Sequence, residues 1–445
     1  MSNLITIERK KRGIFILLFL AIINHIMLIY PNSQNISYLT LILIVVTLYN
    51  SSIGLSLWIL TISTSGIFET QHNMSTFNTL LIAVTGTLLI KEVINSIKTG
   101  ALQYKKNIIY FVFMLTLTSV ISYIFNLDGT SFASNIALFC FLMILIFTAR
   151  LCYVDHTAIN LFLYAFIIAT ISALVFSAPE IMSDGFRRLS VAGNVRAMSN
   201  IVGYSLFTML ISLIYRNYIL SSYSYLSFPF TRGNRMIHIF LISIFAILLI
   251  MTGSRGVILA IVISFGVMLF FSMLWKGKIR RINKGYLIFS FLMIIIAISL
   301  LVSSLPTETE LFERLRPSAS LYTGDSYFGN IRWLIWETTI REMNGMQWFF
   351  GAGLAQFRNL AIKGGFDYYA HSVFVDTFVS LGFIGFSILF LFLLRISYVV
   401  IKNRNILTLG LLSYLIISFF THGMLLNSFF WVNLAIVCGI SYKGL

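Results

Sequence analysis

The longest apolar stretch of the chain reads HSVFVDTFVSLGFIGFSILFLFLL, from His371 to Leu394. About 20 predominantly apolar residues suffice for a helix to cross the hydrocarbon core of a bilayer, so this stretch is long enough. Similar stretches recur along all 445 residues, of which 58% are hydrophobic and 10% charged. Soluble domains average roughly 45–50% apolar and 25% charged residues, so we predict a polytopic membrane protein.

Fourteen apolar stretches are candidates for membrane-spanning helices. They cover residues 13–30, 36–49, 53–68, 77–91, 107–125, 132–149, 157–176, 198–215, 236–251, 256–275, 286–303, 371–394, 406–420 and 428–442. Some are short, and we therefore predict an all-α fold with about 12–14 transmembrane helices. No soluble domain is evident at either end, so residues 1–445 are predicted to form a single membrane domain.

The formal net charge of +16 is distributed unevenly along the chain. Basic residues precede the first apolar stretch and recur in every second loop after it. The positive-inside rule assigns these loops and both termini to the cytoplasm. Membrane topology thus accounts for the charge, and no nucleic acid partner is expected. The apolar run after Arg12 lacks a convincing cleavage site, so we predict a retained first span.

The loops on the opposite face carry ten basic residues, nine of them arginines. They are Arg187, Arg188, Arg196, Arg255, Arg314, Arg316, Arg332, Arg341, Arg358 and Lys363. Membrane insertion disfavours basic residues on this face, so a ligand or a structural partner is expected for them. A guanidinium group can hold two phosphate oxygens at once, which favours a phosphate ligand.

Residues 304–370 form the longest outer loop, and loops of this length usually carry function. Within it, residues 329–345 are predicted to form an amphipathic helix in which Glu337 and Arg341 are spaced for an ion pair. The apolar side of that helix is expected to hold Ile331, Leu334, Ile335 and Thr338. The tryptophans of the loop suit the lipid headgroup layer, and they are Trp333, Trp336 and Trp348. Gly351-Ala-Gly353 and Gly364-Gly365 are expected to let the loop fold back over the membrane.

Several motifs follow one another on the outer face. They are Thr252-Gly-Ser-Arg255-Gly256, Gly329-Asn-Ile-Arg332, Phe350-Gly351-Ala-Gly353, and His371-Ser-Val-Phe-Val-Asp376 followed by Leu381-Gly382-Phe-Ile-Gly385. In this order they resemble the O-antigen ligase and polymerase family over roughly residues 185–390. Members of that family often have asparagine directly after the histidine, where this chain has Ser372.

The resemblance implies a glycosyltransferase of the bacterial inner membrane with its active site on the periplasmic face. The implied donor is an undecaprenyl-pyrophosphate-linked oligosaccharide, and a chain-length regulator protein is a candidate partner besides the membrane lipid. No cofactor is expected. Metal independence is also predicted, because the outer carboxylates that could ligate a divalent ion are scattered, apart from the group Glu308, Glu310 and Glu313.

Within this resemblance, His371 is the candidate catalytic residue. A histidine at neutral pH can accept the proton of an attacking hydroxyl group. Arg255, Arg332 and Arg188, in that order of preference, are the candidates for binding the pyrophosphate as its negative charge develops. Asp376 is close enough in sequence to help orient local groups.

Three functions remain open at this point. We favour an O-antigen, or other surface polysaccharide, polymerase that joins lipid-linked repeats. The alternative is an O-antigen ligase that transfers the glycan to lipid A-core. A polysaccharide-lipid flippase or transporter is less favoured, because such proteins usually place ionisable groups at mid-membrane depth and the apolar stretches here are almost free of them.

Overall fold

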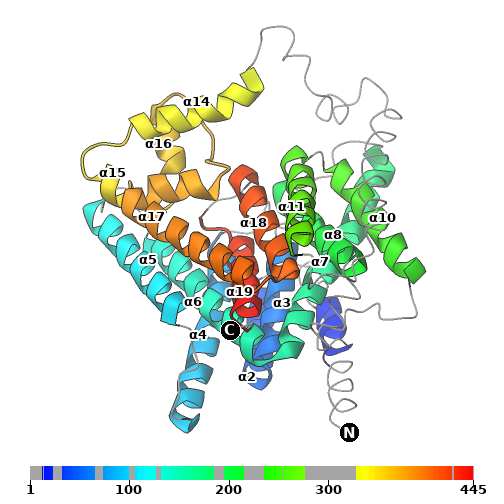
Figure 1. The fold of residues 1–445 in the computed structure, drawn as a ribbon. Helices are drawn as coiled ribbons and strands as arrows, with labels where there is room; N and C mark the ends of the chain where they lie inside the picture. The colour runs from blue at the N-terminus through cyan, green and yellow to red at the C-terminus, as the bar shows by residue number, and fades with distance from the viewer. Residues whose placement is uncertain are drawn as a thin grey trace. The chain divides into compact units, whose positions relative to one another are not determined.

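The computed structural model of this chain describes residues 13, 15–23, 33–65, 74–99, 106–126, 132–184, 195–214, 235–252, 254–275, 327–422 and 425–443. Within these ranges all regular structure is helical and no strand occurs (Figure 1). Four helical segments are long and apolar enough to cross a membrane: Lys106–Phe125, Phe132–Val154, Gly256–Leu274 and Val373–Lys402. Shorter apolar helices accompany them, so the all-α membrane fold is confirmed in outline.

Nearly all predicted spans coincide with observed helices. These are α2 (Ser33–Tyr49), α3 (Ser51–Ser65), α4 (Met74–Thr99), α5 (Lys106–Phe125), α6 (Phe132–Val154), α7 (His156–Asp184), α8 (Val195–Ile214), α10 (Arg235–Met251), α11 (Arg255–Leu274), α17 (Val373–Lys402), α18 (Ile406–His422) and α19 (Ser428–Lys443). Of the first predicted span, residue 13 and residues 15–23 are described and helical. The predicted span 286–303 lies outside the described residues.

Two compact units make up the chain, and the first comprises the described parts of residues 1–102 and 150–315. In this unit α3 packs against α2, α4 and α7, and α8 packs against α7, α10 and α11. One end of the unit is held by polar contacts. The Lys91 ammonium group donates to the carbonyl of Leu48, 2.8 Å away, and Glu92 forms an ion pair with Arg150.

These contacts bring together the turn at residue 50, the end of α4 and the α6–α7 junction. The alternating topology predicted from the basic residues places the same three segments on one face of the membrane. The contacts therefore agree with the predicted alternation of helix direction, while the assignment of this end to the cytoplasm stays a prediction of the positive-inside rule.

The second unit comprises the described parts of residues 103–149 and 316–445, and α17 is its central helix. It packs against α5, α18 and α19. Phe111 of α5 stacks on Phe392 with 3.8 Å between ring centroids, and the Ser122 hydroxyl donates to the Ser380 carbonyl at 3.0 Å. Since the later residue of α5 meets the earlier residue of α17, the two helices run antiparallel.

A kink at Gly382 divides α17. Gly382 has φ +66° and ψ −170°, a conformation open to glycine and rare for other residues. The backbone N–H groups of Ala352 and Gly353 donate to the carbonyls of Val379 and Ser380, at 2.7 and 3.1 Å. The kink thus leaves two segments, residues 373–381 and residues 383–402. The second is about 30 Å long at 1.5 Å per residue, which is the thickness of the hydrocarbon core.

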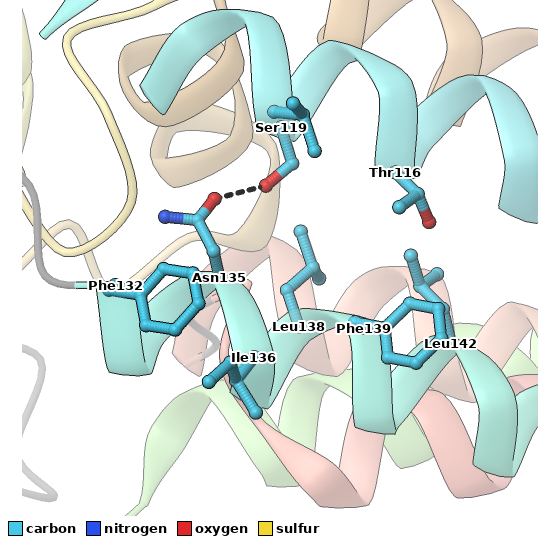
Figure 2. A pocket seen from close by; sticks show the side chains of 9 residues that line it. Thr116, Ser119, Phe132, Asn135, Ile136, Leu138, Phe139 and Leu142 are labelled. Atoms are coloured by element: carbon cyan, nitrogen blue, oxygen red, sulfur yellow. Dashed lines mark hydrogen bonds between the residues drawn. The ribbon is translucent and has the colours of Figure 1, made fainter. Parts of the chain in front are cut away.

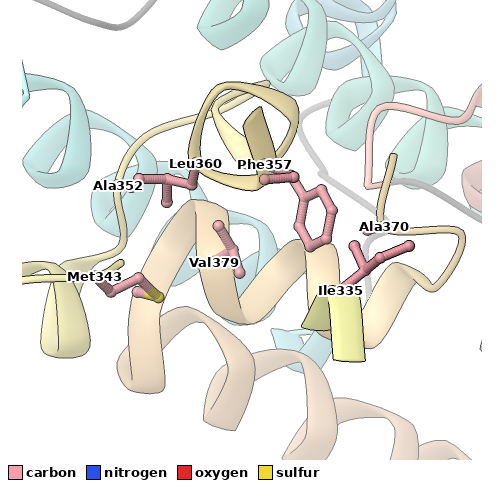
Figure 3. Close-up of a cluster of buried hydrophobic side chains, with 8 residues drawn as sticks. Ile335, Met343, Ala352, Phe357, Leu360, Ala370 and Val379 are labelled. Atoms are coloured by element: carbon pink, nitrogen blue, oxygen red, sulfur yellow. The ribbon is translucent and has the colours of Figure 1, made fainter. Parts of the chain in front are cut away.

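Residues 327–370, which we call the loop module, lie over the first segment of α17 (Figure 1). They contain α14 (Tyr327–Arg341), α15 (Gln347–Phe350) and α16 (Phe357–Lys363), and α14 confirms the predicted helix in this loop. A buried apolar cluster joins the module to α17 (Figure 3). Its members are Ile335, Met343, Ala352, Phe357, Leu360, Ala361, Ala370 and Val379.

The predicted apolar side of α14 is partly wrong. Ile335 is buried as predicted, but Leu334 is 42% exposed, and Thr339 is fully buried in its place. Glu337 and Arg341 form the predicted ion pair, with 2.5 Å between their charged atoms. The buried side of α14 is therefore rotated about the helix axis relative to the predicted apolar side. The reason is that α14 packs against both α16 and α17.

Candidate functional site

His371 lies directly before the first segment of α17 and has an unusual backbone conformation. Its φ is +52°, in the left-handed region that non-glycine residues seldom occupy. Its side chain is buried, with 9% of its surface exposed. Strained backbone of this kind costs of order 1–3 kcal/mol and concentrates at active sites, where surrounding contacts hold it in place. The conformation thus agrees with the choice of His371 as the candidate catalytic residue.

Trp336 of α14 holds the backbone of Ala370, the residue before His371. Its indole Nε1 donates to the carbonyl of Ala370 at 2.8 Å, and its ring packs against the apolar cluster. The indole is half-buried in the protein, and the predicted position of Trp336 in the lipid headgroup layer stays a prediction.

Arg332 is placed one helical turn before Trp336 on α14. Side chains four residues apart on a helix are neighbours, with about 5–6 Å between their Cβ atoms. Because Trp336 reaches the residue next to His371, the face of α14 that carries Arg332 is directed toward the same region. Arg332 has an exposed surface, yet burial of part of its side chain lowers the pKa of its guanidinium group. Glu337, the acidic residue of α14 that follows Trp336, is paired with Arg341. The structure therefore places one of the three predicted arginines in the loop module, which ends directly before His371.

A second arginine, Arg358, is linked to His371 by the side chain of Tyr369, which contacts both residues. Arg358 holds Asp367 with two hydrogen bonds, from Nε at 2.6 Å and from Nη2 at 2.9 Å. Its guanidinium carbon also lies 5.3 Å from the ring centroid of Tyr369, a cation–π contact. The Tyr369 ring is in turn 6.5 Å from the ring of His371.

Electrostatics within this group keep Arg358 and Asp367 charged. The hydrogen bond from Arg358 holds the pKa of the Asp367 carboxyl below its ordinary value of 3.8. The same hydrogen bond, with the nearby Tyr369 hydroxyl, raises the pKa of Arg358. Arg358 is thus engaged by the protein, and its exposed side chain braces Tyr369 beside His371.

These partners change the interpretation of the outer arginines. Arg341 and Arg358 each have a carboxylate partner in the loop module, so structural ion pairs account for both. Our sequence interpretation included Arg358 among the outer cations but gave it no role. The sequence holds no local pattern that predicts this ion pair, because residues 358 and 367 come together only when the loop between them folds.

Asp376 has a structural role that differs from the predicted one. The buried carboxylate accepts a hydrogen bond from the backbone N–H of Leu425 at 2.7 Å, and a longer one of 3.4 Å from the Ser380 hydroxyl. The indole of Trp431 donates to the carbonyl of the same Leu425 at 2.8 Å. Asp376 therefore fixes the turn between α18 and α19 to α17, and neither of these hydrogen bonds reaches His371.

Ser372 caps the start of α17 with its backbone only. Its φ and ψ of −148° and 122° are extended, and its side chain makes no capping hydrogen bond. The residue is fully buried, and its hydroxyl oxygen has no hydrogen-bond partner among the described residues. Buried polar atoms are usually satisfied, so this hydroxyl beside His371 needs an explanation.

Of the other two predicted arginines, the structure describes only the backbone of Arg255, in the first unit. Arg255 is the first residue of α11. Before it, the hydroxyl of buried Thr252 donates to the carbonyl of Leu249 in α10 at 2.6 Å. The side chain of Arg255 lies outside what the structure describes, and so does the whole of Arg188. Their binding of pyrophosphate stays a prediction.

A cavity of about 210 Å³ lies between α5 and α6 (Figure 2). Apart from Thr116 and the hydrogen-bonded pair Ser119 and Asn135, 2.6 Å apart, its lining is apolar. No ionisable side chain lines it, so it lacks the charge that a phosphate group requires. Among the described residues, no group of three histidine, cysteine or acidic side chains is placed to hold a metal ion.

The arrangement thus offers the imidazole of His371, a tyrosine braced beside it, and the guanidinium of Arg332 one helical turn from Trp336 on α14. A search among curated proteins finds no match to this chain. A family model described as O-antigen ligase matches residues 239–391, from α10 to the second segment of α17. This match includes Arg255, Arg332 and His371, and it confirms the resemblance seen in the motifs. Residues 239–391 of this chain are thus similar to the O-antigen ligase family.

Proposed function

We propose that this protein is a surface polysaccharide polymerase of the O-antigen type. It would transfer a glycan from undecaprenyl pyrophosphate to the non-reducing-end hydroxyl of another lipid-linked repeat. The reaction would take place at the periplasmic face of the bacterial inner membrane. The family match supports a membrane glycosyltransferase-like enzyme, and the positive-inside rule supports an outward-facing loop module.

In the proposed reaction, the acceptor oxygen forms a bond to the anomeric carbon while the bond from that carbon to the pyrophosphate oxygen breaks. The hydroxyl proton passes to the imidazole of His371. The pyrophosphate leaves with the bonding electron pair, and we propose that Arg332 binds its growing negative charge. Arg255 and Arg188 are proposed for the same role from the sequence alone. Preorganised cations of this kind stabilise a transition state because they need no rearrangement as charge develops.

The observation that carries this proposal is the strained, buried His371 at the point where α14 and α17 meet. Contacts from both elements hold its backbone: Trp336 bonds to Ala370, and Ser372 begins α17. A histidine with only a structural role could be replaced by a residue with less backbone strain. An imidazole held in this strained conformation supports a chemical role.

The test is transfer by purified protein in vesicles that contain lipid-linked repeats. His371→Asn removes the base but keeps a residue that tolerates positive φ. We expect a fall in turnover of about 10²–10⁴-fold while folded protein is retained. Normal turnover by the folded variant would exclude His371 as the base. The same assay tests metal independence, since we expect turnover to survive EDTA.

The ligase remains the second candidate, because the matching family model is described as O-antigen ligase. A deletion strain separates the two activities. Loss of a polymerase leaves lipopolysaccharide capped by one repeat, whereas loss of a ligase leaves no glycan attached. Accumulation of lipid-linked repeats confined to the inner leaflet would instead point to a flippase and would contradict both enzymes.

A further inference from the structure

The loop module exposes an apolar surface on and beside α15. Met346, Trp348 and Phe349 are 59%, 44% and 56% exposed. Water-facing turns seldom carry three consecutive or nearly consecutive large apolar side chains, so such a surface calls for a partner. We call this set the α15 surface.

The position of α15 along the helices of its unit identifies that partner. Phe350 stacks on Phe125, the last residue of α5, with 5.2 Å between ring centroids. The Asn126 amide donates to the Gly351 carbonyl at 3.0 Å, and the Gln347 amide donates back to Asn126 at 3.1 Å. α15 is therefore fixed to the end of α5 (Figure 1).

The kink in α17 lies at the same level. Gly382 faces α15 so closely that a Cβ atom on it would come within 2.3 Å of the Phe349 carbonyl oxygen. From this kink, residues 383–402 continue for about 30 Å, and α5 has the same length of about 30 Å over its 20 residues. α5 and residues 383–402 are thus antiparallel and equally long, and each matches the thickness of the hydrocarbon core. Because both have one end at α15, we place the membrane boundary at α15.

The lipid-facing surface of α5 continues into the α15 surface. Ile124 and Phe125, at the end of α5, are both more than half exposed, as expected for side chains that meet lipid. The indole nitrogen of Trp348 already donates to the Met343 carbonyl at 3.0 Å, so its polar group is satisfied while its ring stays exposed. A tryptophan of this kind suits the boundary between headgroups and acyl chains.

From these contacts we infer that the α15 surface is immersed in the bilayer interface and anchors the loop module to the lipid. The partner is the lipid itself, at the junction of headgroups and acyl chains. The charged side of the module differs, since Asn359, Lys363 and the Arg358–Asp367 pair are exposed on and after α16. The anchor concerns lipid contact alone and holds whether the enzyme is a polymerase or a ligase.

Spin labelling in phospholipid vesicles tests this inference. Cys140, Cys152 and Cys438 are buried, so a nitroxide reagent would react with an introduced, exposed cysteine. The probe is Phe349→Cys, and the matched control in the same module is Asn359→Cys. We expect the label at 349 to collide several-fold more with oxygen, which concentrates in lipid, than with a water-soluble nickel chelate. The label at 359 should show the reverse.

Two results would overturn the anchor. Equal access of the nickel chelate to both positions would place the α15 surface in water. Protection of position 349 from oxygen and nickel alike would mean that protein, such as a second copy of the chain, covers it. If Phe349→Cys does not fold, Met346→Cys carries the same test, since Met346 is equally exposed at the start of α15.

Discussion

Gly351 lies against Ser380 so closely that a Cβ atom on Gly351 would come within 2.2 Å of the Ser380 carbonyl oxygen. Gly351 also has φ +82°, which favours glycine independently of the space around it. This close approach lets the backbone of residues 351–353 bond to the kinked turn of α17. The glycines of the Phe350–Gly353 and Leu381–Gly385 motifs thus join the loop module to the helix that follows His371.

Gly351→Ala is expected to break this connection. The new methyl group would meet backbone atoms that cannot turn aside, and overpacking plus left-handed strain would cost roughly 2–5 kcal/mol. Gly345→Ala is the matched control, because Gly345 also has positive φ but no atom within 4 Å of its would-be Cβ. We expect it to cost only about 1 kcal/mol. Thermal unfolding in detergent measures both, and equal costs would mean that the close approach is absent.

Substitutions at His371 should separate the backbone from the imidazole. His371→Gly relieves the left-handed strain, whereas His371→Ala retains strain of roughly 1–2 kcal/mol. We therefore expect the glycine variant to unfold at a higher temperature than the alanine variant, while both lose transfer to the same extent. Equal melting temperatures would contradict the observed φ, and unequal residual activities would point to a role for the backbone in catalysis.

The sequence predicts the helices of this protein well because hydrophobic segments report local properties. α5, for example, begins and ends within one residue of its prediction, and the Glu337–Arg341 pair follows from helix geometry alone. The kink at Gly382 was not predicted, because an apolar run through a glycine has the same composition whether the helix is straight or bent. Its cause is the contact with residues 351–353, some 30 positions earlier.

The candidate site was predictable in part for the same reason. His371 and Arg332 belong to motifs that resemble those of the O-antigen ligase and polymerase family, and the structure places Arg332 in the loop module and His371 directly after it. The Arg358–Asp367 pair and the bond from Trp336 to Ala370 depend on how the loop folds, and no periodicity encodes them. The hydrogen bond from Leu425 to Asp376 was not predictable either, since residue 425 lies in the turn between α18 and α19, far along the chain.

Arg332 and Arg341 offer a matched comparison on α14. Arg332→Ala should raise the KM for the lipid-linked donor or lower turnover by roughly 10–100-fold, because a charge-assisted contact to phosphate contributes about 1.5–3 kcal/mol. Arg341→Ala removes an exposed i,i+4 ion pair that contributes about 0.3–0.5 kcal/mol, so its kinetics should stay near normal. Steady-state assays in vesicles compare the two. Equal losses would remove the case for Arg332 as a phosphate ligand.

The Arg358–Asp367 pair should give a defined pH dependence. The pKa of Asp367 is lower in the folded protein than its ordinary value of 3.8, so its contribution to stability is present above that value. The contribution is lost as the pH falls from 3.8 through the lowered pKa. We expect Asp367→Asn to destabilise the module equally at pH 5 and pH 8 and to have no effect at the acid limit. Protease cleavage within residues 357–370 measures this, and an effect that changed between pH 5 and pH 8 would contradict the assignment.

Ser372→Ala should separate a structural hydroxyl from one that serves substrate. A buried hydroxyl without a partner costs about 1–3 kcal/mol, so its removal should leave stability unchanged or raise it by roughly 1 kcal/mol. If the hydroxyl instead bonds to substrate beside His371, transfer should fall about 10-fold, as for the loss of one hydrogen bond of about 1.4 kcal/mol. We expect this combination of kept stability and reduced transfer. A destabilised variant would mean that an ordered water already satisfies the hydroxyl, and full activity would exclude contact between Ser372 and the substrate.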